Sequence, residues 1–208
     1  MKQHIKRAAI ILGVAGMIVA GVGATAMATG AKHTRIHFQM VRSAASEAAG
    51  DNCLPKAKAE VTVQSKGSVE VMTIIASGLP KNTDFDLFVI QVPNAPFGMS
   101  WYQGDLNSNK WGVATGTFVG RFSIETFSVA PGTAPAPVVH PSDASSNPAT
   151  APVHQYHLGL WFNSPADAVA AHCTGSTTPF NGDHTAGVQA LSTKNFPNDH
   201  GPLRDLQP

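Results

Sequence analysis

Short strand-like segments separated by turn residues constrain the fold of this chain more than any other feature. Residues 60–64 alternate apolar and polar side chains, and Lys66-Gly67 leads into a second run over residues 69–76, which predicts a hairpin. Phe85–Val92 is apolar at odd and even positions, so we expect a central strand covered on both faces. Further strands are expected over residues 99–103, 111–122, 124–129, 154–162 and 187–192. The sequence therefore predicts a mainly β fold, a single β-sandwich domain over residues 53–208.

One or two short helices accompany these strands. Ser164 is a typical N-cap residue, Pro165 follows at the first helical position and Asp167 at the third, so a helix is expected from Pro165 to about His172. Residues 29–52 contain good helix formers with apolar side chains at roughly helical spacing, which predicts an N-terminal helix or a stalk. The proline-rich segment 130–152 cannot form a central strand or helix and is expected to be an interaction loop or a mobile linker.

The N-terminus has the organisation of a secretory signal. Lys2, Lys6 and Arg7 precede an uncharged apolar run, and Ala26-Met27-Ala28 fits the cleavage rule, so we expect a signal peptide over residues 1–28. Cleavage after Ala26 is the close alternative. If the run is not cleaved, it is long enough to anchor the domain in a membrane. The sequence thus predicts a secreted protein, or a protein displayed at the cell surface.

Charge and cysteine content agree with an exported binding domain. The chain has 14 basic and 13 acidic residues, and removal of the signal leaves 11 and 13, which disfavours nucleic acid as a partner. Cys53 and Cys173 both lie in the exported part, where an oxidising environment lets thiols pair. We expect them to form a disulfide that closes a loop of about 120 residues. Free thiols, one of them a metal ligand, are the alternative.

The segment Gly78-Leu79-Pro80-Lys81-Asn82-Thr83-Asp84-Phe85-Asp86-Leu87 resembles a corner found in fibronectin type III and related immunoglobulin-like sandwiches. In that corner a Leu, a Pro, a turn-forming pair with Thr, and a Tyr two residues later recur in this order. Phe85 stands at the place of the Tyr, so the hydroxyl group of the tyrosine corner is missing here. The resemblance covers about ten residues and implies a sandwich with adhesion or binding roles.

Two sets of side chains are candidate binding sites. On the 154–162 strand, alternation puts Leu158, Leu160 and Phe162 toward the core and His157, Gly159, Trp161 and Asn163 on the opposite face. An aromatic ring beside a glycine and polar groups could bind a sugar or an extended peptide, although Trp161 could instead pack under the following helix. Trp101 and Tyr102 could line a groove or cap the core. Copper or zinc ligands are the other possibility, for which the candidate residues are His154, His157, His172 and His184.

Catalytic motifs are sparse. The sequence contains no G-x-S-x-G, phosphate-loop or dinucleotide-binding motif. Asp183-His184 places an acid beside a histidine and could serve a secreted hydrolase, yet Asn181-Gly182-Asp183 also has the composition of an ordinary turn. The sequence therefore favours a secreted, non-catalytic protein that binds an extracellular glycan, peptide or protein. A membrane becomes a partner only if the signal is retained. A copper- or zinc-binding protein and a hydrolase are the alternatives.

Overall fold

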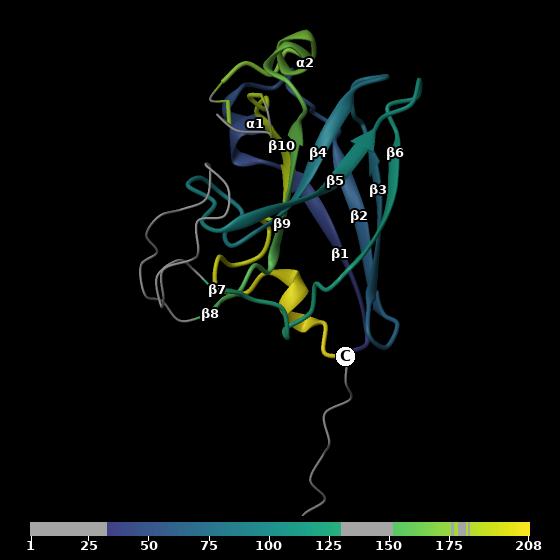
Figure 1. Cartoon of the computed structure of the whole chain (residues 1–208). Coiled ribbons are helices and arrows are strands. Elements are labelled where there is room, and N and C mark those ends of the chain that lie inside the picture. The colour runs from purple at the N-terminus through teal and green to yellow at the C-terminus, as the bar shows by residue number, and fades with distance from the viewer. Residues whose placement is uncertain (1–32, 130–151, 176, 179–181, 183) are drawn as a thin grey trace, which may run out of the picture. The chain divides into compact units, whose positions relative to one another are not determined.

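The alternating segments form antiparallel strands in a computed structural model, which describes residues 33–129, 152–175, 177–178, 182 and 184–208 (Figure 1). Eight strands build one sheet in the order β5-β4-β9-β10-β1-β2-β3-β6. Their bounds are β1 Arg35–Arg42, β2 Lys58–Ser65, β3 Glu70–Ser77, β4 Asp84–Ile90, β5 Ser100–Asn107, β6 Ala114–Gly120, β9 His157–Phe162 and β10 Gln189–Ser192. A separate short ladder joins β7 (Ser128–Val129) to β8 (Pro152–Val153). The predicted mainly β class and the β2–β3 hairpin are confirmed.

The sheet is nearly closed into a barrel. Its two end strands, β5 and β6, lie next to each other, but no ladder of backbone hydrogen bonds joins them in the described part of the chain (Figure 1). Side chains fill this seam instead. A Cβ added to Gly104 would lie 2.7 Å from the ring of Phe118, and one added to Gly116 would lie 2.6 Å from a methyl group of Leu106. The two glycines therefore let β5 and β6 approach without pairing.

The core lies inside the curved sheet. Inward-facing side chains from all eight strands bury their apolar surface there, and burial of this kind is the main force that stabilises such a fold. Phe85, Leu87 and Val89 of β4 belong to this core. The other face of β4 is also covered, by a second small cluster that includes Ile90, Trp161 and Ala186. The prediction of a central strand covered on both faces is confirmed.

The expectation of a helix or stalk over residues 29–52 is wrong for residues 35–42 and holds only for a short segment after them. Residues Arg35–Arg42 form β1, which pairs with β2 on one side and β10 on the other, and α1 (Ala44–Ala48) follows. In β1, Phe38 and Met40 are buried while His37 and Gln39 are exposed. This period of two is that of a strand, so the domain begins well before residue 53.

The second helix follows its sequence signal. Ser164 is the N-cap of α2 (Pro165–Ala170), and its hydroxyl accepts the N–H of Asp167 at 3.2 Å. A 3-10 helix, η1 (Pro202–Asp205), packs near β1 at the end of the chain. None of the described helices has the length and apolar character needed to cross a membrane. The predicted signal peptide and the 130–152 loop lie outside the described residues, apart from Pro152 in β8.

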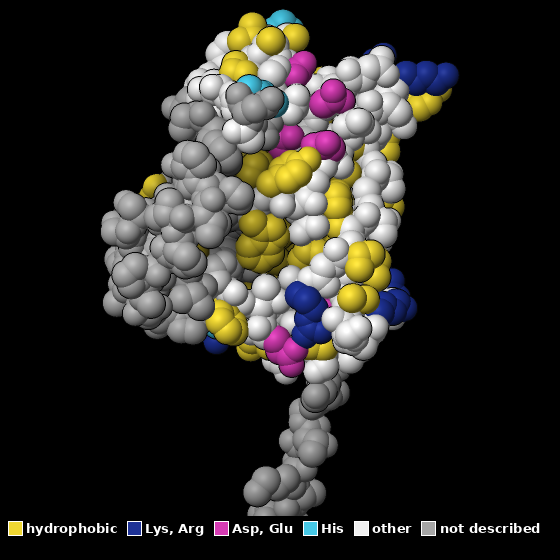
Figure 2. All heavy atoms as spheres, viewed as in Figure 1, with side chains coloured by type: hydrophobic (Ala, Val, Ile, Leu, Met, Phe, Trp, Pro, Cys, Tyr) yellow, Lys and Arg dark blue, Asp and Glu magenta, His cyan; other side chains and the backbone are white. Residues whose placement is uncertain are grey.

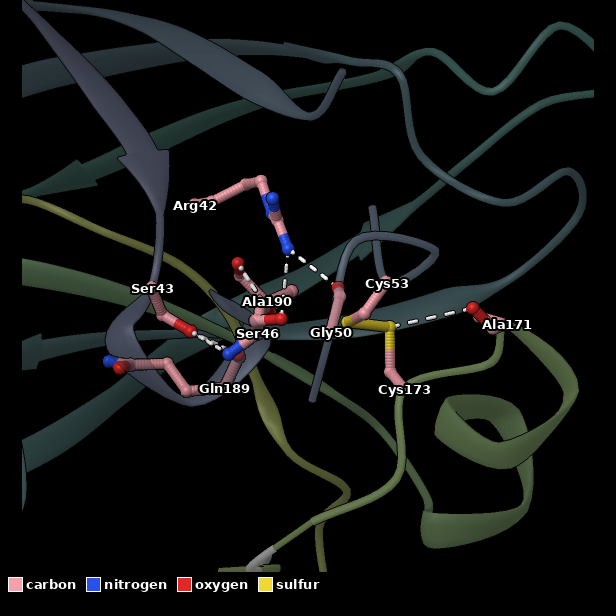
Figure 3. Close-up of a disulfide and its surroundings, with 9 residues drawn as sticks. All are labelled: Arg42, Ser43, Ser46, Gly50, Cys53, Ala171, Cys173, Gln189 and Ala190. Atoms are coloured by element: carbon pink, nitrogen blue, oxygen red, sulfur yellow. Dashed lines mark hydrogen bonds between the residues drawn. A yellow bond between two sulfur atoms is a disulfide. The ribbon is translucent and has the colours of Figure 1, made fainter. Parts of the chain in front are cut away.

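The predicted disulfide between Cys53 and Cys173 is present (Figure 3). Cys53 follows α1, and Cys173 follows α2, so the bond joins the two helical segments at one end of the sheet. Both cysteines are buried in the main core. This position makes the disulfide a part of the folded core and not an exposed link between loops.

Candidate ligand-binding site

The outer face of β4, β9 and β10 carries the site. Along β9, Leu158, Leu160 and Phe162 enter the main core, as the alternation predicts, and Trp161 lies on the opposite face. In the sheet, Trp161 stands opposite Asp86 of β4 and Gln189 of β10. The face of β9 that the sequence singles out is therefore shared by three neighbouring strands.

Trp161 is only 3% exposed, so it does not present an open ring for stacking. Its ring is in edge contact with Phe88 (centroids 5.3 Å apart) and Phe97 (5.0 Å apart). The aromatic cover thus comes from β4 and from the loop after it, and not from the following helix, which was the alternative to an exposed binding face. Gly159 leaves room for the Trp161 ring, because a Cβ at this position would lie 2.2 Å from that ring.

The loop that follows β4 holds Phe97 over Trp161. Phe97 has φ of 59°, a left-handed conformation that costs a bulky residue about 1–2 kcal/mol. The Phe97 N–H donates to the Asn94 carbonyl at 2.9 Å, and the Phe97 carbonyl accepts the N–H of Val92 at 3.1 Å. These two hydrogen bonds stabilise the left-handed conformation of Phe97 and hold its ring against Trp161.

A pocket of about 200 Å³ lies beside these rings, and we call it the Trp161 pocket. Its lining residues are Ala45, Ala95, Phe97, Trp161, Thr177, Thr178 and Gln189. A smaller cavity of about 70 Å³ shares Phe97, Trp161 and Thr178 with it. For scale, an engineered apolar cavity of about 150 Å³ holds benzene. The Trp161 pocket is therefore large enough for one small ring or a branched apolar group.

Two residues that line the pocket each carry a buried hydrogen-bond donor without a partner among the described residues. The donors are the indole Nε1 of Trp161 and the amide Nε2 of Gln189, and Gln189 is 2% exposed. Further along the same ladder, the buried Ser192 hydroxyl opposite Gly159 also has no partner in the part of the chain described. Buried polar groups are almost always hydrogen-bonded, so these donors require a water molecule or a ligand.

The backbone that carries Gln189 is firmly held. The register of β9 and β10 shifts between Gln189 and Leu191, which leaves carbonyl groups outside the ladder. The Ser46 hydroxyl of α1 donates to the carbonyls of Gln189 (2.8 Å) and Ala190 (3.0 Å), and the Ser43 hydroxyl also donates to Gln189. The serines of this segment therefore bind the backbone of Gln189 and not its side-chain amide. Figure 3 shows that the Gln189 side chain extends away from the disulfide.

The aromatic contacts continue from Phe88 to an acidic group on β5. The Phe88 ring is in edge contact with Tyr102 (5.7 Å), and the Tyr102 hydroxyl donates to the Asp105 carboxylate at 2.5 Å. Burial, with the nearby charge of Asp105, raises the pKa of Asp86 to about 6. Burial and the hydrogen bond to Asp105 raise the pKa of Tyr102 to about 12. Figure 2 shows hydrophobic side chains gathered in the middle of the face seen there, with acidic side chains beside them.

The other residues proposed for ligand binding lie in different surroundings. His157 is fully buried and hydrogen-bonded to the Thr193 hydroxyl (2.9 Å) and the Asn198 carbonyl (3.3 Å), and burial lowers its pKa. Trp101 packs against the main core and donates to the Gln103 amide at 3.2 Å. Asn163 is half-buried, and its N–H donates to the Asp84 carbonyl at 3.0 Å. Of the five, only Trp161 lines the pocket.

The four histidines proposed as metal ligands do not converge. His154 stacks on Tyr156, His157 is buried against Thr193, and His172 is exposed at the end of α2. The charge of His184 lowers the pKa of Asp86, an effect smaller than those of burial and of Asp105, which raise it. Among the described residues, no three or more His, Cys, Asp or Glu side chains are grouped so that they could hold a metal ion. Asp183, the proposed partner of His184 in a hydrolase, lies outside the described residues.

Sequence reasoning identified Trp161 and Gly159 but missed Phe88, Phe97, Thr178 and Gln189. Phe88 was predicted to be a covered strand residue, while its contact with Trp161 depends on strand order. Phe97 reaches the pocket through a left-handed backbone conformation, and Gln189 reaches it next to a β-bulge. No residue pattern in the sequence predicts either feature. Comparison of the chain with models of protein families and with curated proteins finds no match. The site must therefore be interpreted from its own chemistry.

Proposed function

We propose that this chain is an exported, non-catalytic protein that binds a small neutral group in the Trp161 pocket. The group is a separate molecule or a part of an extracellular glycan, peptide or protein. The observation that carries the proposal is an apolar pocket in which two lining residues, Trp161 and Gln189, each carry a buried donor without a partner among the described residues. Ligand sites are commonly apolar cavities with a few fixed polar groups, and the Trp161 pocket has this composition.

Export is supported by the N-terminal signal pattern and by the disulfide. Disulfides persist in oxidising compartments and are rare in the cytosol. We also propose an immunoglobulin-like sandwich as the finer architecture of the fold. It is supported by the corner sequence Gly78–Leu87 and by the antiparallel sheet that folds around a single core.

A pocket-filling variant tests the proposed function. Thr178 lines the pocket, so Thr178→Leu places extra methyl groups in the space that a ligand would occupy. Thr115→Leu adds the same side chain on the exposed outer face of β6 and is the matched control. Trp161→Ala is less suitable because loss of a buried tryptophan usually costs about 3–5 kcal/mol of folding free energy, which would obscure any effect on binding.

The probe is N-ethylaniline, a neutral aromatic molecule without a carbonyl group, titrated into ¹⁵N-labelled protein. We expect saturable shifts of the Trp161 indole N–H and of the Phe97 and Thr178 amides, with affinity in the range of about 1 mM, typical of a small fragment. These shifts should persist in Thr115→Leu and disappear in Thr178→Leu. If neither N-ethylaniline nor acetanilide, which carries a carbonyl, binds to the unmodified protein, the proposed function is wrong.

A further inference from the structure

The residues that line the Trp161 pocket restrict the chemistry of its ligand. Among the described residues, the seven side chains that line it carry no charge. An ion entering an apolar site without a counter-charge loses its hydration and gains little in return. A neutral ligand is therefore favoured over a carboxylate, a phosphate or an ammonium group.

The polar groups of the pocket restrict the ligand further. An indole N–H can only donate a hydrogen bond, and the Gln189 atom that has no partner in the described chain is its amide nitrogen, also a donor. Both belong to side chains that are more than nine-tenths buried. Gln189 and Trp161 stand opposite each other on β10 and β9. Two donors on facing residues match an oxygen atom with two lone pairs.

We propose that the Trp161 pocket recognises a neutral carbonyl group, as in an amide, ester or ketone, attached to a compact apolar body. The carbonyl oxygen accepts from Trp161 Nε1 and Gln189 Nε2, while the apolar body lies against Phe97 and the Ala95 methyl group. This inference rests on the proposed function, because it assigns the ligand class of the same pocket.

A matched pair of probes tests it. Acetanilide and N-ethylaniline share the aromatic ring and the N–H and differ by the carbonyl oxygen. We expect acetanilide to bind about tenfold more tightly, because it satisfies donors that otherwise stay unpaired. On binding, the Trp161 indole N–H resonance, assigned by its loss in Trp161→Phe, should move downfield with acetanilide and much less with N-ethylaniline. Benzoate, which carries a charge, should bind more weakly than acetanilide.

Two glutamine variants separate the hydrogen bond from general packing. Gln189→Leu removes one donor while it keeps the size of the side chain, so the preference for acetanilide should fall to about threefold or less. Gln155→Leu is the control, since Gln155 is another buried glutamine whose Nε2 has no partner among described residues, and it does not line the pocket. This control should keep the full preference.

The outcomes distinguish the two proposals. If both probes bind the unmodified protein equally well, the pocket binds ligands but the carbonyl assignment is wrong. If acetanilide binds without moving the indole resonance, or if Gln189→Leu keeps the tenfold preference, the assignment is also overturned. If neither probe binds, both proposals fail, and water molecules are the partners of the two donors.

Discussion

Asp86 is a carboxylate on the outer face of β4 that the surrounding structure almost completely buries. It stands opposite Asp105 in the β4–β5 ladder, and it contributes to the raised pKa of Tyr102 as a nearby negative charge. Above pH 6 the folded protein holds a buried charge next to a second carboxylate. Burial and like charge both disfavour the ionised form, so the folded state retains a proton on Asp86 at a pH where the unfolded chain does not.

Asp86→Asn should therefore change how stability depends on pH. Between about pH 4 and pH 6 the folded state binds more protons than the unfolded state at this site, so Asp86 makes the protein less stable as the pH rises through that window. The variant should lose this trend and unfold at higher urea concentration than the unmodified protein at pH 7.5. Equilibrium urea unfolding at several pH values provides the measurement.

The control for this variant is Asp51→Asn, which changes an exposed carboxylate that is not among the groups acting on the pKa of Asp86. The lowered pKa of His157 acts in the opposite sense, because protonation of the unfolded state weakens folding as the pH falls below about 6.5. Since His157 is present in every variant, its contribution cancels in the difference. An Asp86→Asn protein with an unchanged pH profile would contradict the interpretation of Asp86.

At this scale, sequence reasoning succeeds where local chemistry decides. The cysteine pair and the glycine beside Trp161 were predicted, because oxidised thiols pair and strand alternation places residues on one face. It fails where tertiary neighbours decide. Whether Trp161 is exposed depends on Phe97, which follows β4 and lies more than sixty positions earlier in the chain. A residue pattern contains no information about that contact.

Helix α1 acts as a brace for the bulge in β10. Its serines bind carbonyl groups that the ladder leaves without strand partners, and the Ser43 N–H adds a further bond to the Ala190 carbonyl at 3.1 Å. Arg42 closes the same region from β1, because its guanidinium donates to the carbonyls of Ser46 and Gly50, each at 3.0 Å. A five-residue helix is too short to be stable alone, so these contacts account for its presence.

Ser46→Ala should loosen this brace. The Gln189 and Ala190 carbonyls lose a buried donor, so the free energy of unfolding is expected to fall by about 1 kcal/mol. The amide resonances of Gln189 and Trp161 should shift as well, because the pocket wall is attached to the bulge. Ser68→Ala, in the exposed β2–β3 turn, should change stability by less than about 0.5 kcal/mol. Equal effects of the two substitutions would argue against the bracing role.

The sequence analysis assigned a helix or stalk to residues that form β1, and this error has a definite cause. Residues 43–49 have good helix formers, and a window that includes them obscures the period of two in residues 36–40. Strands with a clear flanking turn, such as β2 and β3, were placed correctly because Lys66-Gly67 marks where the chain reverses. Element type is thus predictable where turn residues separate the elements, and less so where strand and helix adjoin.

The whole domain depends on a bond between two of its helical segments. The disulfide closes a loop of 120 residues that contains most of the sheet strands. Replacing both cysteines by serine should lower the free energy of unfolding by about 2–5 kcal/mol, measured by urea unfolding. The unmodified protein in a strong reductant should approach the same value. A loss below about 1 kcal/mol in both experiments would mean that the core holds this end of the sheet without the bond.

Strand order and closure are properties of the whole molecule that the sequence did not reveal. The alternation of apolar and polar residues identifies each strand separately. The order of the strands in the sheet depends on how their apolar faces pack together around one core. The eight described strands form one sheet whose end strands meet side by side, and a pattern of single strands reveals neither this order nor this approach.

Within the sheet ladder, β10 alone connects the group β5-β4-β9 to the group β1-β2-β3-β6 (Figure 1). Its partner β1 lies near the start of the domain, with Val41 opposite Ser192 and Arg42 opposite Leu191. Contacts between such distant segments form slowly, because a long stretch of chain must close first. A chain that emerges from the ribosome or from a translocation channel with its N-terminus first therefore cannot complete its sheet until residue 192 has followed. The sheet is therefore completed only when nearly all of the described domain has emerged.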